Sequence, residues 1–157
     1  MVSTEARSIE AANAPRRPTE YLLRSDTGQL SNVMIYRLTM EGFALKDVQA
    51  MLSISFLYSN QKVMSRIVGK SIRTIQRQGS SKQPAQLNPQ QSAVAFQYAK
   101  ALEHATTVFG SQKLAEEWLG RPCKYLEGEV PLEVIDNPVG FQAVEDYLER
   151  MTLGVYQ

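Results

Sequence analysis

The sequence is poor in the residues that build disulfides, zinc sites and nucleophilic active sites. It contains one cysteine, Cys123, and one histidine, His104, among 157 residues. A single cysteine excludes a disulfide within the chain, and the pair is too small for a Cys–His metal cluster. A cysteine nucleophile also needs a nearby base, and no glycine-rich phosphate loop is present. We therefore expect no enzymatic activity, no metal and no cofactor.

Long apolar runs are absent as well. None approaches the ~20 residues needed to span a bilayer, and the polar start, with Glu5, Arg7 and Glu10, is unlike a secretory signal. These absences predict a cytoplasmic protein. The length suits one ordinary domain or two small ones. Because two small domains would each be marginal alone, dimerisation or a partner would help, and we expect an oligomer.

Acidic residues are missing from one long stretch of the chain. Residues 53–92 contain no Asp or Glu, whereas residues 93–157 hold ten acidic and five basic residues. The first 52 residues carry six of each sign, and the whole chain has a net charge of +1. A cationic middle followed by an anionic C-terminal part suggests two different partners. The basic residues of the middle stretch are Lys62, Arg66, Lys70, Arg73, Arg77 and Lys82.

The spacing of apolar residues predicts an all-α fold. Apolar residues recur at helical intervals, and capping residues and glycines mark several helix ends. Asn88 followed by Pro89 is a strong start signal for a long helix. Residues 123–130 are compatible with a short extended or hairpin segment. The expected helices cover residues 30–41, 44–52, 60–68, 71–78, 88–109, 112–119, a single turn at 131–135, and 138–153.

Residues 61–77, which read QKVMSRIVGKSIRTIQR, have the spacing of a helix-turn-helix. Ser65 is small, as required where the second helix crosses the first, and Gly69 permits left-handed geometry in the turn. Ile75 would then face inward. Such spacing is weak by itself, and a helical hairpin with a solvated basic face is the alternative. The absence of acidic residues favours a DNA-binding unit.

The outward side chains of the second helix suit DNA. Arg and Gln can pair with base edges in the major groove, whereas Lys, Ser and Thr suit phosphates. The start of a helix also favours a phosphate. The predicted DNA-binding residues are Lys70, Ser71, Arg73, Thr74, Gln76 and Arg77.

The C-terminal part carries a long ordered string of residues. The string consists of Phe109-Gly110, Ala115, Trp118-Leu119, Pro122, Leu126-Glu127-Gly128, Pro131-Leu132, Gly140, Val144, Leu148 and Gly154. Over roughly residues 94–156 it resembles the Xre/MbcA/ParS toxin-binding domain, and the upstream helix-turn-helix resembles that of the same antitoxins. Glu127 departs from the pattern, which favours a small residue before Gly128. The expected divisions are a flexible tail (1–26) with room for one short helix, an Xre-like helix-turn-helix domain (27–87) and a toxin-binding domain (88–157).

The resemblance implies the antitoxin of a type II toxin–antitoxin pair. Its partner would be a toxin of the RES fold, which consumes NAD or transfers ADP-ribose. The antitoxin would cover the active-site entrance of the toxin with its C-terminal region, and would repress its own operon by binding the promoter. It would form a homodimer within a larger toxin–antitoxin complex. The predicted toxin-binding residues are Glu145, Glu149, Arg150, Thr152, Gly154, Val155, Tyr156 and Gln157.

Two alternatives remain open on the sequence. The chain could be a stand-alone helix-turn-helix regulator whose C-terminal domain only dimerises. The last helix and tail could also be a solvated helix face with a frayed end.

Overall fold

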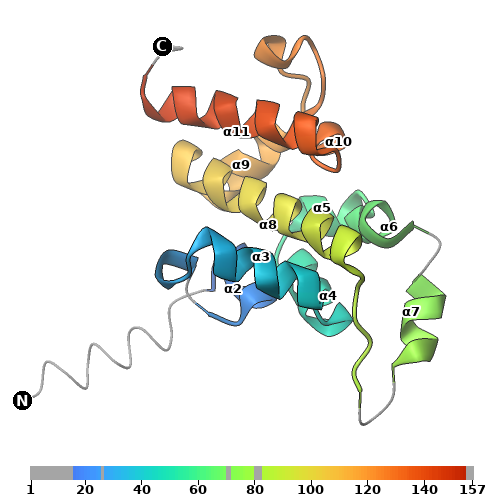
Figure 1. Cartoon of the computed structure of the whole chain (residues 1–157). Helices are drawn as coiled ribbons and strands as arrows, with labels where there is room; N and C mark the ends of the chain where they lie inside the picture. The colour runs from blue at the N-terminus through green and yellow to red at the C-terminus, as the bar shows by residue number, and fades with distance from the viewer. Residues whose placement is uncertain (1–15, 26, 70–71, 80–82, 155–157) are drawn as a thin grey trace, which may run out of the picture.

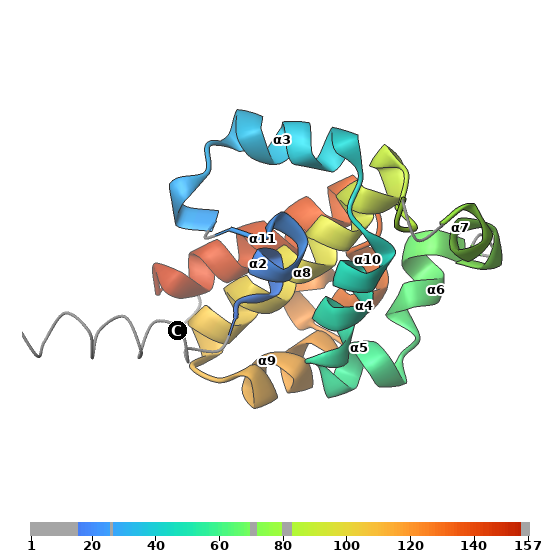
Figure 2. The same ribbon diagram turned by 90° about the horizontal axis from the view of Figure 1, so that it is seen from below.

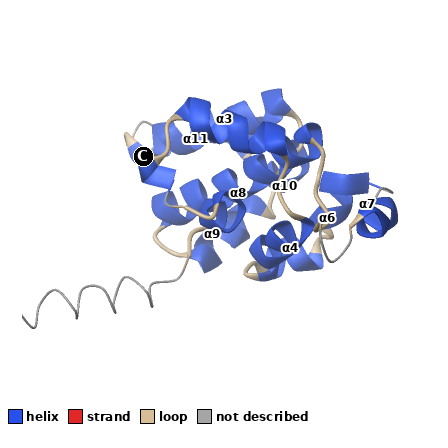
Figure 3. Cartoon of the chain, turned by 60° about the horizontal axis from the view of Figure 1, so that its bottom comes forward, coloured by secondary structure: helices blue, strands red, loops and turns tan. Residues whose placement is uncertain are grey.

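The computed structural model describes residues 16–25, 27–69, 72–79 and 83–154. These residues form helices joined by loops and contain no strand, only an isolated bridge between Ala44 and Gln86 (Figures 1 and 3). The predicted all-α fold is confirmed. The elements are α2 (Pro18–Leu23), η1 (Thr27–Gln29), α3 (Asn32–Glu41), α4 (Leu45–Ser53), α5 (Phe56–Asn60), α6 (Val63–Val68), α7 (Ile72–Gln78), α8 (Pro89–Phe109), α9 (Gln112–Leu119), η3 (Lys124–Leu126), α10 (Pro131–Val134) and α11 (Pro138–Thr152).

Helix α8 is the central element around which both halves of the chain pack. It begins as predicted: the Asn88 side chain accepts from Gln91 N, the Gln91 side chain accepts from Asn88 N, and Pro89 occupies the first turn. Its neighbours are α9 and α11 from the C-terminal half and α2, α3 and α6 from the N-terminal half (Figure 2). Fully buried alanines such as Ala95 and Ala99 let these helices approach closely. The predicted domain border at residue 87/88 therefore stays a prediction, since α8 packs against both halves.

Part of the expected N-terminal tail is a packed helix. Leu22 and Leu23 of α2 are buried, and the helix packs against α4 and α8. Thr19 Oγ1 donates a hydrogen bond of 2.6 Å to Glu103 of α8. A helix of six residues is too short to show a helical period of apolar residues. The sequence therefore indicated one short helix in this region but not its bounds. Residues 1–15 and 26 lie outside the described residues, and a tail there stays a prediction.

Two segments differ from the sequence prediction. The helix expected at 60–68 begins only at Val63, because Lys62 before it adopts a left-handed conformation with φ 54°. The preceding residues form the separate short helix α5, whose N-terminus is capped by the Ser55 hydroxyl. In place of an extended segment, residues 123–130 form a loop around η3, in which Cys123 N donates to Glu129 O and Gly128 N donates to Cys123 O.

Polar side chains join the two halves across their packed surface. Glu116 of α9 accepts hydrogen bonds from Ser55 Oγ (2.6 Å) and Leu57 N (2.7 Å), and Gln112 donates to Ile54 O. The hydroxyl of Tyr58 donates to the carbonyl of Tyr98 at 2.7 Å. Burial raises the pKa of Tyr58 well above its ordinary value, and burial raises the pKa of Tyr98 to about 12.

Helices α10 and α11 approach each other closely at one glycine. Gly140, in the first turn of α11, lies so near α10 that an added Cβ would overlap the carbonyl oxygen of Val134. Only glycine fits this position, and it is one of the residues of the family-like string.

No helix in the described part of the chain is both long enough and apolar enough to cross a bilayer.

Candidate functional site

The predicted DNA-reading helix is α7, and it presents its polar side chains to solvent. Arg73, Thr74, Gln76 and Arg77 are exposed, whereas Ile75 is buried at 5% exposure. This is the inward and outward division predicted from the sequence. Among the described residues, neither arginine lies within salt-bridge distance of a carboxylate. Lys70 and Ser71, also predicted to bind DNA, lie outside the described residues.

The turn before α7 follows the prediction at one position and departs from it at another. Gly69 has φ +60°, in the region that favours glycine, and closes α6 by donating from its N–H to Ser65 O. Ser65 itself is exposed, so α7 does not cross over it in the way the sequence spacing suggested. Instead, α7 stands to the side of the bundle (Figure 1).

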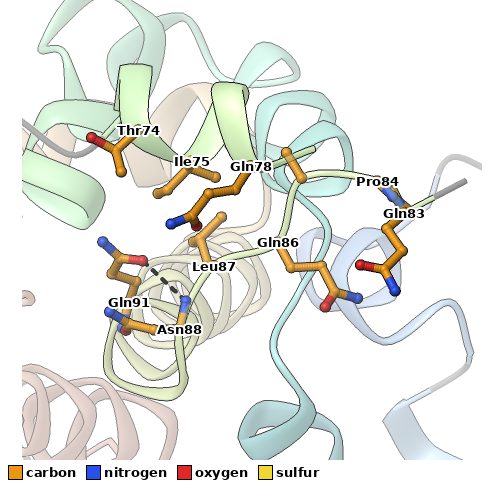
Figure 4. A pocket seen from close by; sticks show the side chains of 10 residues that line it. Thr74, Ile75, Gln78, Gln83, Pro84, Gln86, Leu87, Asn88 and Gln91 are labelled. Atoms are coloured by element: carbon orange, nitrogen blue, oxygen red, sulfur yellow. Dashed lines mark hydrogen bonds between the residues drawn. The ribbon is translucent and has the colours of Figure 1, made fainter. Parts of the chain in front are cut away.

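The inner side of α7 faces the segment that leads back into α8. A pocket of about 730 Å³ separates them, lined by Thr74, Ile75 and Gln78 on one side and by residues 83–88 and Gln91 on the other (Figure 4). The far wall is tied to the bundle, because Leu45 N donates to Ala85 O and Leu87 N donates to Phe43 O. None of the described residues that line this pocket is acidic.

The second candidate site is α11 with the end of the chain, and the predicted residues there fall into two groups. Glu145 faces inward: its Oε2 lies 2.7 Å from His104 Nδ1 of α8, and the Glu145 side chain is 15% exposed. Glu149, Arg150 and Thr152 are exposed on the outer side. Gly154 ends the described chain with φ 73°, and Val155, Tyr156 and Gln157 lie outside the described residues.

The placement of Glu145 changes the charge of the outer surface of α11. With Glu145 bound to His104, the exposed carboxylates of this helix are Asp146 and Glu149. His104 is half-buried against α11 with its side chain 20% exposed. We therefore assign Glu145 a role in joining α8 to α11, and leave the outer carboxylates as the candidates for contact with a partner.

An aromatic column, which the sequence reasoning missed, supports α11 from below. Trp118 of α9 stacks on Tyr147 of α11 with ring centroids 5.2 Å apart, and Tyr125 also stacks on Tyr147 at 5.7 Å. Phe109 contacts Trp118 at 5.5 Å. Tyr147 lies three residues after the buried Val144, so helical spacing carried the signal. Tyr125 is the most exposed ring of the aromatic column, at 54%.

The chain has one cysteine and one histidine. Cys123 is buried, and His104 bonds to Glu145. The described residues contain no group of three His, Cys, Asp or Glu side chains that could hold a metal ion. What the geometry offers is two surfaces: a basic helix on the N-terminal half, and a helix with exposed carboxylates on the C-terminal half.

Comparison with known families agrees with this division. The model of the antitoxin Xre-like helix-turn-helix domain matches residues 34–100, and that of the antitoxin Xre/MbcA/ParS C-terminal toxin-binding domain matches residues 104–154. A search of curated proteins finds no match. The two matches follow each other in the order predicted from the sequence. The chain thus belongs to the Xre/MbcA/ParS antitoxins, with an Xre-like helix-turn-helix followed by the toxin-binding domain.

Proposed function

We propose that this antitoxin neutralises a RES-type toxin by covering the entrance to its active site, and represses its own operon by binding the promoter as a homodimer. The observation that carries the proposal is the separation of the two surfaces. Helix α7 and the C-terminal end of α11 lie at opposite ends of the molecule in all three views (Figures 1–3). One chain can therefore hold DNA and a toxin at the same time.

On the DNA side, α7 supplies the donors that read a major groove. Arg73 and Arg77 are four residues apart on one helix and both exposed, so they follow the same edge of the helix. Gln76 and Thr74 lie between them. Arginine and glutamine make paired hydrogen bonds with guanine and adenine edges, and unpaired arginines also neutralise phosphates. The missing acidic residues remove the repulsion that would oppose this approach.

On the toxin side, the proposal rests on a helix that ends at the surface. Thr152 and Leu153 are exposed, Leu153 at 69%, and the chain continues beyond them for four residues. An end of this kind can enter a cleft. A cleft that binds a nucleotide such as NAD is expected to be cationic, and the outer carboxylates Asp146 and Glu149 would complement it. The proposed neutralisation involves binding alone and no cofactor, in the cytoplasm.

The decisive experiment is co-expression with the product of the adjacent reading frame. If that protein is a RES-type toxin, it should arrest growth when expressed alone, and this chain should restore growth and co-purify with it. NAD levels in the arrested cells should fall, which identifies the chemistry of the toxin. An adjacent protein that neither arrests growth nor binds this chain contradicts the neutralisation part of the proposal.

A further inference from the structure

Helix α3 is the one long helix of the described chain that contains no buried residue. Its exposed side chains are nevertheless apolar: Val33 is 58% exposed, Met34 47%, Tyr36 61% and Met40 50%. These are four of the nine large apolar side chains exposed on the described residues. Scattered apolar residues on a surface are ordinary, but a cluster on one element marks a contact surface.

The exposed apolar residues lie on the face of α3 that points away from the protein. Ile35 and Leu38 pack against the core. At 100° per residue, Val33, Tyr36 and Met40 fall on the opposite side of the helix, as positions i, i+3 and i+7. Figure 2 shows α3 as the outermost element on its side of the molecule. Among the described residues, α3 thus has two apolar faces, of which only the one with Ile35 and Leu38 is covered.

We propose that a second copy of this chain covers this outer face, with the two α3 helices packed antiparallel about a two-fold axis. The proposal rests on the homodimer proposed above and assigns its contact surface. An axis between Tyr36 and Arg37 places Val33 opposite Met40 of the second copy. It also places Arg37 over the Tyr36 ring of the second copy, a favourable cation–π arrangement. The face is therefore complementary to itself, as a two-fold contact requires.

The charges of the helix fit the same arrangement. Its only ionisable side chains apart from tyrosine are Arg37 and Glu41, one of each sign. The two Arg37 side chains flank the axis, and each has Glu41 of its own helix four residues further on as an opposite charge. Arg37 is the charged residue of α3 that lies beside the stripe formed by Val33, Tyr36 and Met40.

Two observations favour a second copy over the toxin as the occupant. Residues 34–41 belong to the range matched by the helix-turn-helix model, whereas the toxin-binding model matches only residues 104–154. In addition, α7 has seven residues and four exposed polar side chains of the predicted set. One such helix reads only a short half-site, and helix-turn-helix proteins double the site by binding as two-fold dimers.

The length of α3 sets the expected strength of the dimer. A helix of ten residues is about 15 Å long. Its contact with a copy of itself is smaller than the roughly 800 Å² per partner of a standard interface. We therefore expect a dimer that dissociates in the micromolar range in solution and is strengthened by a two-fold operator.

The test is sedimentation of the full chain over a range of concentrations. Tyr36→Glu and Met40→Glu should each raise the dimer dissociation constant at least tenfold. The matched controls Phe56→Glu and Val139→Glu replace apolar residues that are 80% and 78% exposed on other helices, and should leave it unchanged. A wild-type chain that stays monomeric at every concentration overturns the proposal, and so does a dimer that the α3 variants leave intact.

A cross-link tests the geometry without an acidic substitution. The natural Cys123 is buried, so a short bifunctional maleimide should join two chains of Arg37→Cys and spare both the wild type and the control Lys113→Cys. Equal cross-linking of the two variants contradicts the two-fold axis at α3. Neutralisation of the toxin by Tyr36→Glu separates the two proposals. If Tyr36→Glu no longer neutralises the toxin but still dimerises, the toxin and not a second copy occupies the outer face of α3. That result contradicts the proposed dimer contact but leaves the antitoxin function standing.

Discussion

Glu116 of α9 accepts a hydrogen bond of 2.6 Å from the Ser55 hydroxyl at the start of α5. The same carboxylate accepts a second bond from Leu57 N. A residue of the toxin-binding domain therefore satisfies the N-terminal donors of a helix in the helix-turn-helix domain. This arrangement couples the two domains through a charged helix cap and explains why α5 forms despite its five residues.

Glu116→Ala should destabilise the whole chain by about 2 kcal/mol, because it removes two hydrogen bonds to a carboxylate and leaves donors at the start of α5 unsatisfied. Thermal or urea unfolding measures the effect. Glu117→Ala is the matched control, since Glu117 is exposed and pairs with Arg121 at 3.8 Å; its effect should stay below about 0.5 kcal/mol. Equal effects of the two substitutions would contradict the role assigned to Glu116.

The buried tyrosines predict a loss of stability at high pH. The pKa of Tyr98 is raised by burial to about 12, whereas an unfolded tyrosine titrates near 10. Between these values the unfolded chain releases a proton that the folded chain retains, and this favours unfolding. The contribution of Tyr98 is therefore complete below about pH 10 and declines as the pH rises toward 12.

The measurement is urea unfolding of the wild type and of Tyr98→Phe between neutral pH and strongly alkaline pH. The wild type should lose stability above about pH 10, and Tyr98→Phe should lose less over the same interval. Tyr125→Phe, at an exposed ring, should follow the wild type. Parallel curves for wild type and Tyr98→Phe would show that Tyr98 does not titrate as proposed.

The sequence predicted the long elements well because their signals are local. Asn88 and Pro89 start α8, and Gly110, with φ +87°, ends it as expected. One residue of the family-like string is also explained by local geometry: Gly140 is required by its contact with Val134 O. These signals depend on residues close to one another in the chain.

Features that depend on distant residues could not be predicted. The 2.7 Å contact between Glu145 and His104 joins residues 41 apart, so the periodicity of α11 did not show that this carboxylate faces inward. The Glu116 cap joins residues 61 apart. Helix α5 is too short to show a period, and its stability depends on that distant cap. The exposed position of Ser65 depends likewise on how α7 packs, which spacing alone does not determine.

Replacing Arg73 and Arg77 together by alanine should weaken binding to the promoter and leave neutralisation of the toxin intact. If both arginines neutralise phosphates, the slope of log affinity against log salt should fall by about 0.9 for each phosphate that is no longer neutralised. Binding measured by fluorescence anisotropy at several salt concentrations gives this slope. The control is Arg121→Ala with Lys124→Ala, which removes the same charge from exposed positions of the other domain. If the control variant loses the same affinity for promoter DNA, the net charge of the chain and not the position of the arginines on α7 determines binding.

Removal of residues 153–157 should abolish or strongly reduce neutralisation, because the proposed contact with the active-site cleft uses the end of the chain. Promoter binding and thermal stability should remain, since Leu153 is 69% exposed and the core residues of α11, Val144 and Leu148, are untouched. Growth rescue in the co-expression strain and inhibition of the purified toxin provide the readouts. Charge reversal at Asp146 and Glu149 tests the outer face of α11 separately. If the truncated chain neutralises as well as the full chain while the charge reversals do not, the helix face and not the tail covers the toxin.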